Sequence, residues 1–296
     1  MPKQYDSIFR PGLFAGQSII VTGGGSGIGR CTAHELAHLG AHVILIGRKQ
    51  AKLDTVQAEI AEDGGRASTA TLDIRIEDDV KRVIGELLAA HGPIQGLVNN
   101  AGGQFPAPLV AINQKGWETV VRTNLTGGFL MSRELFLQGM RSSGGAIVNI
   151  VADMYGGMPM MGHSGAARAG MVNFTETAAV EWASAGVRVN AVAPGWIASS
   201  GLDTYTDPNI RATLPKVRQA VPLKRLAEEA EVAAAINFLL SPAAAYLTGV
   251  TLRVDGGSTL NSRMFPLPDH QRSEAYTGFH RAVRPRILDN PPEDAA

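Results

Sequence analysis

Cysteine and net charge are what this sequence has least of. Cys31 is the only cysteine among 296 residues, which excludes an intrachain disulfide framework and fits a reducing compartment. Lysine plus arginine and aspartate plus glutamate number 27 each, so the formal net charge is +0 and favours neither nucleic acid nor an anionic membrane surface as a partner. The seven histidines and the lone cysteine form no cluster with metal-ligand spacing, so we expect no metal site.

Long apolar runs are missing as well. No stretch approaches the roughly 20 residues that a membrane-spanning helix needs. The first residues, MPKQYDSIFRPGLF, lack the uninterrupted apolar segment of a secretory signal. We therefore expect a cytoplasmic protein that binds no membrane. With 45% hydrophobic and 18% charged residues, the composition is that of a globular protein with a substantial core.

What the chain does contain is a series of short runs rich in Val and Ile that alternate with longer segments of helical period. Runs that are apolar on both faces and separated by helices indicate an α/β fold with a parallel sheet covered on both sides. Gly40, Gly92 and Gly186 stand where helices should end. The strands are expected at residues 18–23, 42–47, 67–74, 94–102, 145–152, 188–195 and 251–257.

The chain shows no boundary that would indicate a second domain. Its length suits one large α/β domain over residues 1–296. Segment 196–228 follows a strand end and has no strand pattern of its own, so we interpret it as a candidate substrate lid. Residues 262–296 are rich in proline and form a C-terminal tail that we expect to be partly irregular.

The run TGGGSGIG at 22–29 lies directly between the first predicted strand and the first predicted helix. Glycines remove Cβ atoms where backbone N–H groups must approach a pyrophosphate, and the N-terminus of the helix adds favourable partial charge. The strand–turn–helix context favours dinucleotide binding over an ordinary glycine loop. The expected contact residues in this run are Gly23, Ser26, Gly27, Ile28 and Gly29.

The end of the second strand indicates which dinucleotide binds. Proteins that bind NAD often place a carboxylate there, whereas this chain has Gly47 followed by Arg48 and Lys49. An arginine can bind a ribose 2′-phosphate bidentately, so NADP(H) is favoured over NAD(H); a solvated basic turn is the alternative. Asp73 and Ile74, which end the third strand, are placed to contact the adenine. The NNAG run that ends the fourth strand should pass beside the cofactor with Asn100, Ala101 and Gly102.

Five motifs stand in one order along the chain: TGGGSGIG, NNAG, RTNLTG, VAPG and VDGG. Together they resemble the short-chain dehydrogenase/reductase family over about residues 13–261. The resemblance implies a single Rossmann-type, doubly wound parallel sheet with helices on both faces, commonly in a homotetramer. Such proteins pass a hydride between a nicotinamide and a carbonyl or an activated alkene. By the same resemblance the cofactor site would also include Arg168, Pro194, Gly195 and Ile197.

Two branches of that family share further motifs with this chain. NNAGGQF, RTNLTGGF and HSGAARAG are most similar to the peroxisomal trans-2-enoyl-CoA reductases and, a little less, to the 2,4-dienoyl-CoA reductases. SIFRPGLFAGQ and ADMYGGMPMMGHSG resemble bacterial dehydrogenases of citronellol and citronellal breakdown. The implied substrate is therefore an acyl-CoA with an activated alkene or an apolar alcohol or aldehyde, and the resemblance leaves both open.

The catalytic group of the family is altered in this chain. Most members use an Asn, a Ser, a Tyr and a Lys, and the Lys both holds the nicotinamide ribose and lowers the pKa of the Tyr. Here the Asn is Asn124, while Ser164 and Arg168 occupy the Tyr and Lys positions, four residues apart on one face of a predicted helix. The usual Ser falls near Val151 and Ala152. Arg168 can bind the ribose, but it cannot shuttle a proton.

The missing phenol leaves the proton donor open. Tyr155 is the leading candidate, because the dienoyl-CoA reductases that the chain resembles place their working tyrosine in the same loop. Asp153, His163 and an ordered water are the alternatives.

Three functions follow from these observations. An enoyl thioester tolerates the loss of the phenol, because charge collects on the thioester oxygen and hydrogen-bond donors around that oxygen do most of the catalytic work. A plain ketone instead needs a proton on the new alkoxide itself. We therefore favour NADPH-dependent reduction of a 2-enoyl or 2,4-dienoyl thioester. The alternatives are an NAD(P)-dependent dehydrogenase of branched terpenoid alcohols or aldehydes and a catalytically inactive NADP-binding protein.

Overall fold

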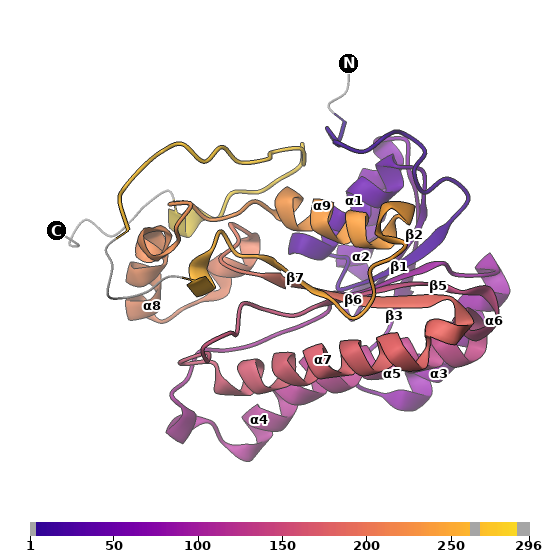
Figure 1. Cartoon of the computed structure of the whole chain (residues 1–296), viewed down its shortest axis with the longest axis horizontal. Coiled ribbons are helices and arrows are strands. Elements are labelled where there is room, and N and C mark those ends of the chain that lie inside the picture. Colours follow the sequence, from indigo (N-terminus) through magenta and orange to yellow (C-terminus); the bar gives the residue numbers. More distant parts are fainter. Residues whose placement is uncertain (1–3, 261–266, 289–296) are drawn as a thin grey trace.

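The computed structural model of the chain describes residues 4–260 and 267–288. Within these residues seven strands form one sheet in the order β3-β2-β1-β4-β5-β6-β7, and all neighbouring strands are parallel (Figure 1). Every strand expected from the sequence is present, and the predicted Rossmann-type α/β fold is confirmed. The strands are β1 (Ser18–Thr22), β2 (His42–Gly47), β3 (Arg66–Thr71), β4 (Gly96–Asn99), β5 (Gly145–Ile150), β6 (Val187–Pro194) and β7 (Thr251–Val254).

The central strands are apolar on both faces because helices cover both faces of the sheet. Along β1, Ile19 and Val21 pack in a core with α1 (Gly27–His38) and α9 (Glu229–Leu240), whereas Ile20 packs in the core on the opposite side. The strand order reverses at β1, whose neighbours are β2 and β4. In such sheets a crevice opens at the carboxyl ends of the strands where the order reverses.

The helices form two layers (Figure 1). One layer consists of α1, α2 and α9, and the other contains α3, α5 and α7, with α4 packed beside α7. Gly40, Gly92 and Gly186 have positive φ and follow helical segments, as predicted. No helix in the described part of the chain is both long and apolar enough to cross a membrane. The remaining helices are α2 (Gln50–Glu62), α3 (Glu77–His91), α4 (Gln114–Val121), α5 (Gly127–Leu135), α6 (Arg141–Ser143), α7 (Gly162–Glu181) and α8 (Pro208–Thr213).

Six of the seven strands end earlier than the sequence predicts, and β3, β4 and β7 end three residues early. β4 ends at Asn99 because the next two N–H groups, of Asn100 and Ala101, both donate to the Thr22 hydroxyl at 3.0 Å instead of to a neighbouring strand. β3 ends at Thr71, three residues before the predicted end at residue 74. The chain therefore leaves the sheet at its carboxyl edge sooner than expected, and the loops formed there line the site.

Segment 196–228 adds no strand to the sheet, as predicted. Its two ends meet where Ile197 and Ala227 form an isolated parallel bridge. Between them lie α8 and short 3-10 turns, so the segment is a compact helical excursion beyond β6.

The C-terminal tail is described over residues 267–288, and the rest of the predicted 262–296 lies outside the described residues. Apart from one 3-10 turn, the described part is irregular, as expected. It runs back over α1, where Phe279 is buried and its ring stacks on that of Tyr5, with 5.7 Å between the ring centroids.

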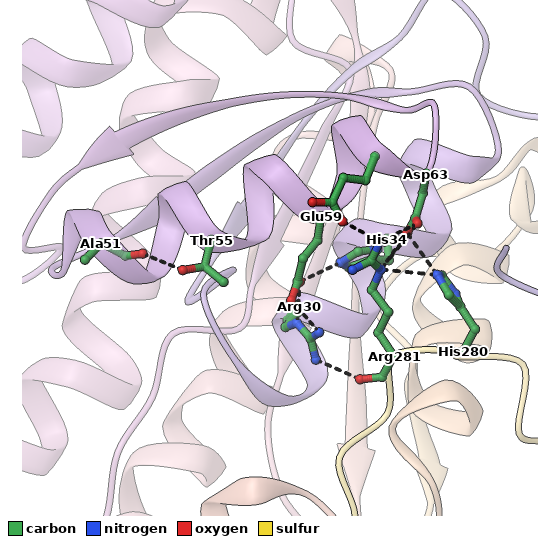
Figure 2. Close-up of polar contacts among 9 residues, drawn as sticks. Arg30, His34, Ala51, Thr55, Glu59, Asp63, His280 and Arg281 are labelled. Atoms are coloured by element: carbon green, nitrogen blue, oxygen red, sulfur yellow. Dashed lines mark hydrogen bonds and ion pairs between the residues drawn. The ribbon is translucent and has the colours of Figure 1, made fainter. Parts of the chain in front are cut away.

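A group of polar side chains, which we call the tail anchor, fixes the tail to α1 and α2 (Figure 2). His34 of α1 lies between the carboxylates of Glu59 and Asp63, at 3.1 and 3.2 Å. From the tail, His280 and Arg281 reach the same Asp63 at 3.0 and 2.7 Å. The tail anchor thus consists of His34, Glu59, Asp63, His280 and Arg281.

Candidate active site

The glycine-rich turn after β1 folds back against the loop that follows β4. Gly23 has a φ of +68°, and a Cβ atom there would lie 2.9 Å from Nδ2 of Asn100. A Cβ atom on Gly29 would lie 2.4 Å from the same Nδ2 and 2.5 Å from the carbonyl oxygen of Gly23. Both positions therefore require glycine. Ser26 precedes α1 and makes no capping hydrogen bond, so the first N–H groups of the helix remain available for a phosphate.

A cleft of about 270 Å³ lies at this edge of the sheet. Nine of the predicted cofactor residues line it: Gly23, Ser26, Ile28, Arg48, Asp73, Ile74, Asn100, Ala101 and Gly102. The cleft is also lined by residues that were not predicted as site residues: Ile46, Gly47, Leu72, Arg75, Thr123 and Ser199. All of these but Ile46 either adjoin a predicted site residue or belong to segment 196–228, and that proximity was the only signal available.

The other predicted cofactor residues lie outside the lining of this cleft: Gly27, Gly29, Lys49, Arg168, Pro194, Gly195 and Ile197. Lys49 is exposed just before α2. A Cβ atom on Gly195 would lie 2.8 Å from Cα of Asp255, so glycine at this position permits close packing of the chain after β6 against the end of β7.

The end of the cleft formed by β2 and β3 carries an excess of positive charge. Asp73 and Arg75 form an ion pair at 2.6 Å, and the hydrogen bonds from Arg75 lower the pKa of Asp73. Arg48 also lines the cleft and is exposed. Because Asp73 is neutralised by Arg75, the charge of Arg48 remains free to attract an anion.

Asn124, Ser164 and Arg168 come together, as their spacing predicts. Asn124 is buried in a π-helical segment, Arg122–Thr126, and its Nδ2 lies 3.5 Å from the hydroxyl of Ser164. Ser164 and Arg168 are both buried on one face of α7. The predicted catalytic residues Asn124, Ser164 and Arg168 are thus contributed by the two segments that flank the loop after β4.

Arg168 is a buried cation that pairs with no carboxylate among the described residues. Its Nη1 donates to the carbonyl oxygen of Ile150 at 2.5 Å, while its Nε has no hydrogen-bond partner among the residues that the structure describes. Burial lowers the pKa of Arg168 to about 10. A buried donor without a partner is costly unless a ligand satisfies it. The guanidinium, the glycine turn and the open helix N-terminus together fit a nicotinamide dinucleotide, whose ribose hydroxyls and pyrophosphate supply the missing acceptors.

The candidate proton donors lie in the loop after β5 and at the start of α7. Tyr155 is exposed, and its ring packs under the guanidinium of Arg253, which lies 5.2 Å from the ring centroid. No hydrogen bond joins Tyr155 to Asn124, Ser164 or Arg168 in the described part of the chain.

Asp153 and His163 have different surroundings. Asp153 accepts a hydrogen bond from the hydroxyl of Ser258, and burial raises the pKa of its carboxyl. His163 is buried edge-on to Phe105; its Nδ1 accepts the N–H of Ser164 at 2.9 Å, and its Nε2 has no partner among the described residues. No group of three or more His, Cys, Asp or Glu side chains that could hold a metal ion occurs within residues 4–260 and 267–288. The fold and the cleft define an oxidoreductase that binds a nicotinamide dinucleotide.

Comparison with known proteins agrees with this class. The family described as Enoyl-(Acyl carrier protein) reductase matches residues 23–259. Glucose 1-dehydrogenase of Gluconobacter oxydans (strain 621H) is 40% identical over 252 residues, which cover 83% of this chain and 93% of that protein. The (3E)-enoyl-CoA-producing peroxisomal 2,4-dienoyl-CoA reductase of Mus musculus is 34% identical over 258 residues, or 86% of this chain and 88% of that protein.

Among solved structures, the citronellol catabolism dehydrogenase of Pseudomonas aeruginosa PAO1 is 63% identical, with a TM-score of 0.78, and covers 86% of this chain and 100% of its own. The chain therefore belongs to the short-chain dehydrogenase/reductase family, as the motifs indicated, and it is an NAD(P)-dependent oxidoreductase.

Proposed function

We propose that the protein uses NADPH to reduce the activated double bond of a 2-enoyl or 2,4-dienoyl thioester. The observation that carries this proposal is the buried group of Asn124, Ser164 and Arg168, which contains hydrogen-bonding side chains and a positive charge but no phenol. Such a group suits a reaction in which negative charge collects on a carbonyl oxygen while the proton is needed at another atom.

The balance of the reaction explains why the phenol is dispensable. When bound, NADPH would supply the hydride, which a 2-enoyl thioester would take up at its β-carbon. The electrons of the double bond then move toward the thioester, so its oxygen carries the charge of an enolate, and the α-carbon takes up a proton in a later step. For this proton we propose Tyr155, with Asp153, His163 and water as the alternatives. A proton that goes to carbon in a separate step can come from a modest acid.

The preference for NADPH rests on the β2–β3 end of the cleft. Arg48 is exposed there and forms no ion pair with a described carboxylate, and Arg75 pairs with Asp73, the one acidic side chain among the described residues that line the cleft. A ribose 2′-phosphate would form charge-assisted hydrogen bonds with Arg48.

The apolar side chains of segment 196–228 favour a substrate with an apolar chain. Leu202 and Leu214 are buried within it, Trp196 remains partly exposed at its start, and Ser199 lines the cleft. We propose that this segment is the lid over the acyl chain.

A second candidate function is the oxidation or reduction of a branched terpenoid alcohol or aldehyde. The specific observation in its favour is the 63% identity to a protein named for citronellol catabolism. The same apolar segment would suit this substrate.

One assay separates the candidates. The assay follows NADPH oxidation by absorbance. We expect oxidation when crotonyl-CoA or decenoyl-CoA is added and a slower rate of oxidation with citronellal. Oxidation with citronellal alone would favour the terpenoid function. Tight NADPH binding with neither substrate consumed would indicate an inactive cofactor-binding protein.

In the same assay Tyr155→Phe should lower turnover at least about tenfold without weakening NADPH binding, and an unchanged rate would remove Tyr155 from the mechanism.

A further inference from the structure

The predicted catalytic residues direct their polar groups at one loop. Oδ1 of Asn124 accepts the N–H of Gly103 at 2.9 Å, and its Nδ2 donates to the carbonyl oxygen of Gly103 at 3.0 Å. Arg168 packs against Gly102, where a Cβ atom would lie 2.6 Å from Nη2. These contacts fix the backbone of residues 102–103 from two sides, and they determine where the next side chain emerges.

That next side chain is Gln104, which is held by Ser164. The hydroxyl of Ser164, itself fully buried, donates to Oε1 of Gln104 at 2.7 Å. The same hydroxyl oxygen lies 3.5 Å from Nδ2 of Asn124. Because its one proton is engaged by Gln104, Ser164 has no proton to offer to a substrate.

The amide group of Gln104 is then the donor that remains. Its oxygen is the atom held by Ser164, so its Nε2, with two N–H bonds, has no protein partner within the described residues. Gln104 is exposed, whereas Asn124 and Ser164 behind it are buried. A planar amide fixed at its oxygen presents its nitrogen in one direction, which is the preorganisation that stabilises developing negative charge.

We propose that Gln104 is a catalytic residue whose Nε2 donates a hydrogen bond to the carbonyl oxygen of the substrate as charge develops there. This inference rests on the proposed function and deepens it, because it names the donor for the enolate oxygen. Ser164 and Asn124 are positioning residues in this scheme. The amide keeps its proton throughout, so the hydride still goes to the β-carbon and the proton on the α-carbon still comes from another group.

Three variants test the proposal. Gln104→Leu removes the donor at similar size, and Gln104→Glu replaces it with a group that donates only when protonated. Gln114→Leu on α4 is the matched control, since Gln114 is an exposed glutamine whose amide donates only to Glu118 in the described structure. For each variant kcat and KM are measured with crotonyl-CoA and with citronellal, and NADPH affinity is measured by fluorescence.

We expect Gln104→Leu to lower kcat about a hundredfold with the substrate that the wild type turns over, while its NADPH affinity stays within about twofold and Gln114→Leu matches the wild type. The activity of Gln104→Glu relative to the wild type should rise as the pH falls from about 8 to about 5, because a protonated carboxyl donates again. A merely structural role would not produce this pH-dependent recovery. Wild-type kcat in Gln104→Leu, or a flat ratio in Gln104→Glu, would overturn the proposal.

Failure of the proposed function can be distinguished from failure of the Gln104 proposal. If the wild type turns over citronellal but no thioester, the enoyl function fails and the same variants test Gln104 on the aldehyde carbonyl. If it turns over neither, binding of crotonyl-CoA to the NADP⁺ complex is measured by calorimetry. At least about tenfold weaker binding to Gln104→Leu supports the proposed contact; equal binding, or none to the wild type, overturns it.

Discussion

Arg168 is buried and Arg188 is half-buried, but only Arg188 has several hydrogen-bond acceptors among the described residues. Arg188 donates to the carbonyl oxygens of Leu239, Leu240, Ser241 and Leu247. Arg168 has Ile150 alone, and its Nε is unpartnered within the described residues. The i, i+4 spacing in the sequence was enough to predict that Ser164 and Arg168 share a face. It could not predict the missing acceptors, because those depend on residues far away in the chain.

This difference predicts that substitutions of Arg168 and of Arg188 have opposite effects on stability. Arg168→Met should raise the melting temperature of the cofactor-free protein, because it removes an uncompensated buried charge. The expected gain in the free energy of unfolding is about 1 kcal/mol. The same variant should weaken NADPH binding at least about tenfold. Arg188→Met, the control, should lower the melting temperature and leave NADPH binding nearly unchanged. Calorimetry with and without NADPH measures both quantities, and a destabilised apo Arg168→Met protein would contradict our interpretation of the site.

At the scale of elements, the tail and segment 196–228 hold each other in place. The carboxylate of Asp203 accepts the N–H groups of Arg286 and Ile287 at 3.2 and 3.1 Å. Ile287 is buried with Leu202 and Leu214 of the segment. Ser199 of the same segment lines the candidate cofactor cleft. The contacts of the tail with this segment therefore help to fix the position of one wall of that cleft.

Asp203→Ala should therefore loosen the segment without unfolding the protein. We expect cleavage by a nonspecific protease between residues 200 and 220 to become about tenfold faster and KM for the substrate to rise several-fold, since two charge-assisted hydrogen bonds are lost. Asp207→Ala is the control, because Asp207 caps α8 within the same segment and makes no hydrogen bond with the described part of the tail. Equal protease sensitivity in the two variants would count against a role of the tail.

All seven strands could be predicted from the sequence because their patterns are local, but six of the seven strand ends were predicted too late. The Thr22 hydroxyl captures the N–H groups that follow β4, and no periodicity within 94–102 could convey a side-chain contact from β1. Gln104 could not be predicted for the same reason. Its proposed role depends on a hydrogen bond from Ser164, sixty residues further along the chain.

At the scale of the whole molecule, Glu35 joins three distant parts of the chain. This fully buried carboxyl on α1 accepts hydrogen bonds from Tyr5 and Ser7 of the N-terminal segment and from Asn237 of α9. Burial raises its pKa from an ordinary value near 4.5 to about 7. The folded state therefore holds a proton that the unfolded chain releases at neutral pH.

This shift makes stability depend on pH. Because the folded-state pKa lies above the unfolded-state value, the contribution is fully present below about pH 4.5 and is lost as the pH rises through about 7, amounting to about 3 kcal/mol at most. Glu35→Gln should therefore gain stability relative to the wild type between about pH 5 and about pH 8, measured by urea unfolding. Glu181→Gln, at the exposed end of α7, should show no such gain, and parallel pH curves for Glu35→Gln and the wild type would refute the argument.

The most direct test of the proposed function is to follow the hydride itself. NADPH carrying deuterium at both C4 positions is incubated with the protein and crotonyl-CoA, and the product is analysed by mass spectrometry and NMR. The proposed reaction places one deuterium on the β-carbon of butyryl-CoA and none on its α-carbon. Deuterium on C1 of citronellol formed in a parallel incubation with citronellal, with crotonyl-CoA left unreduced, would contradict it.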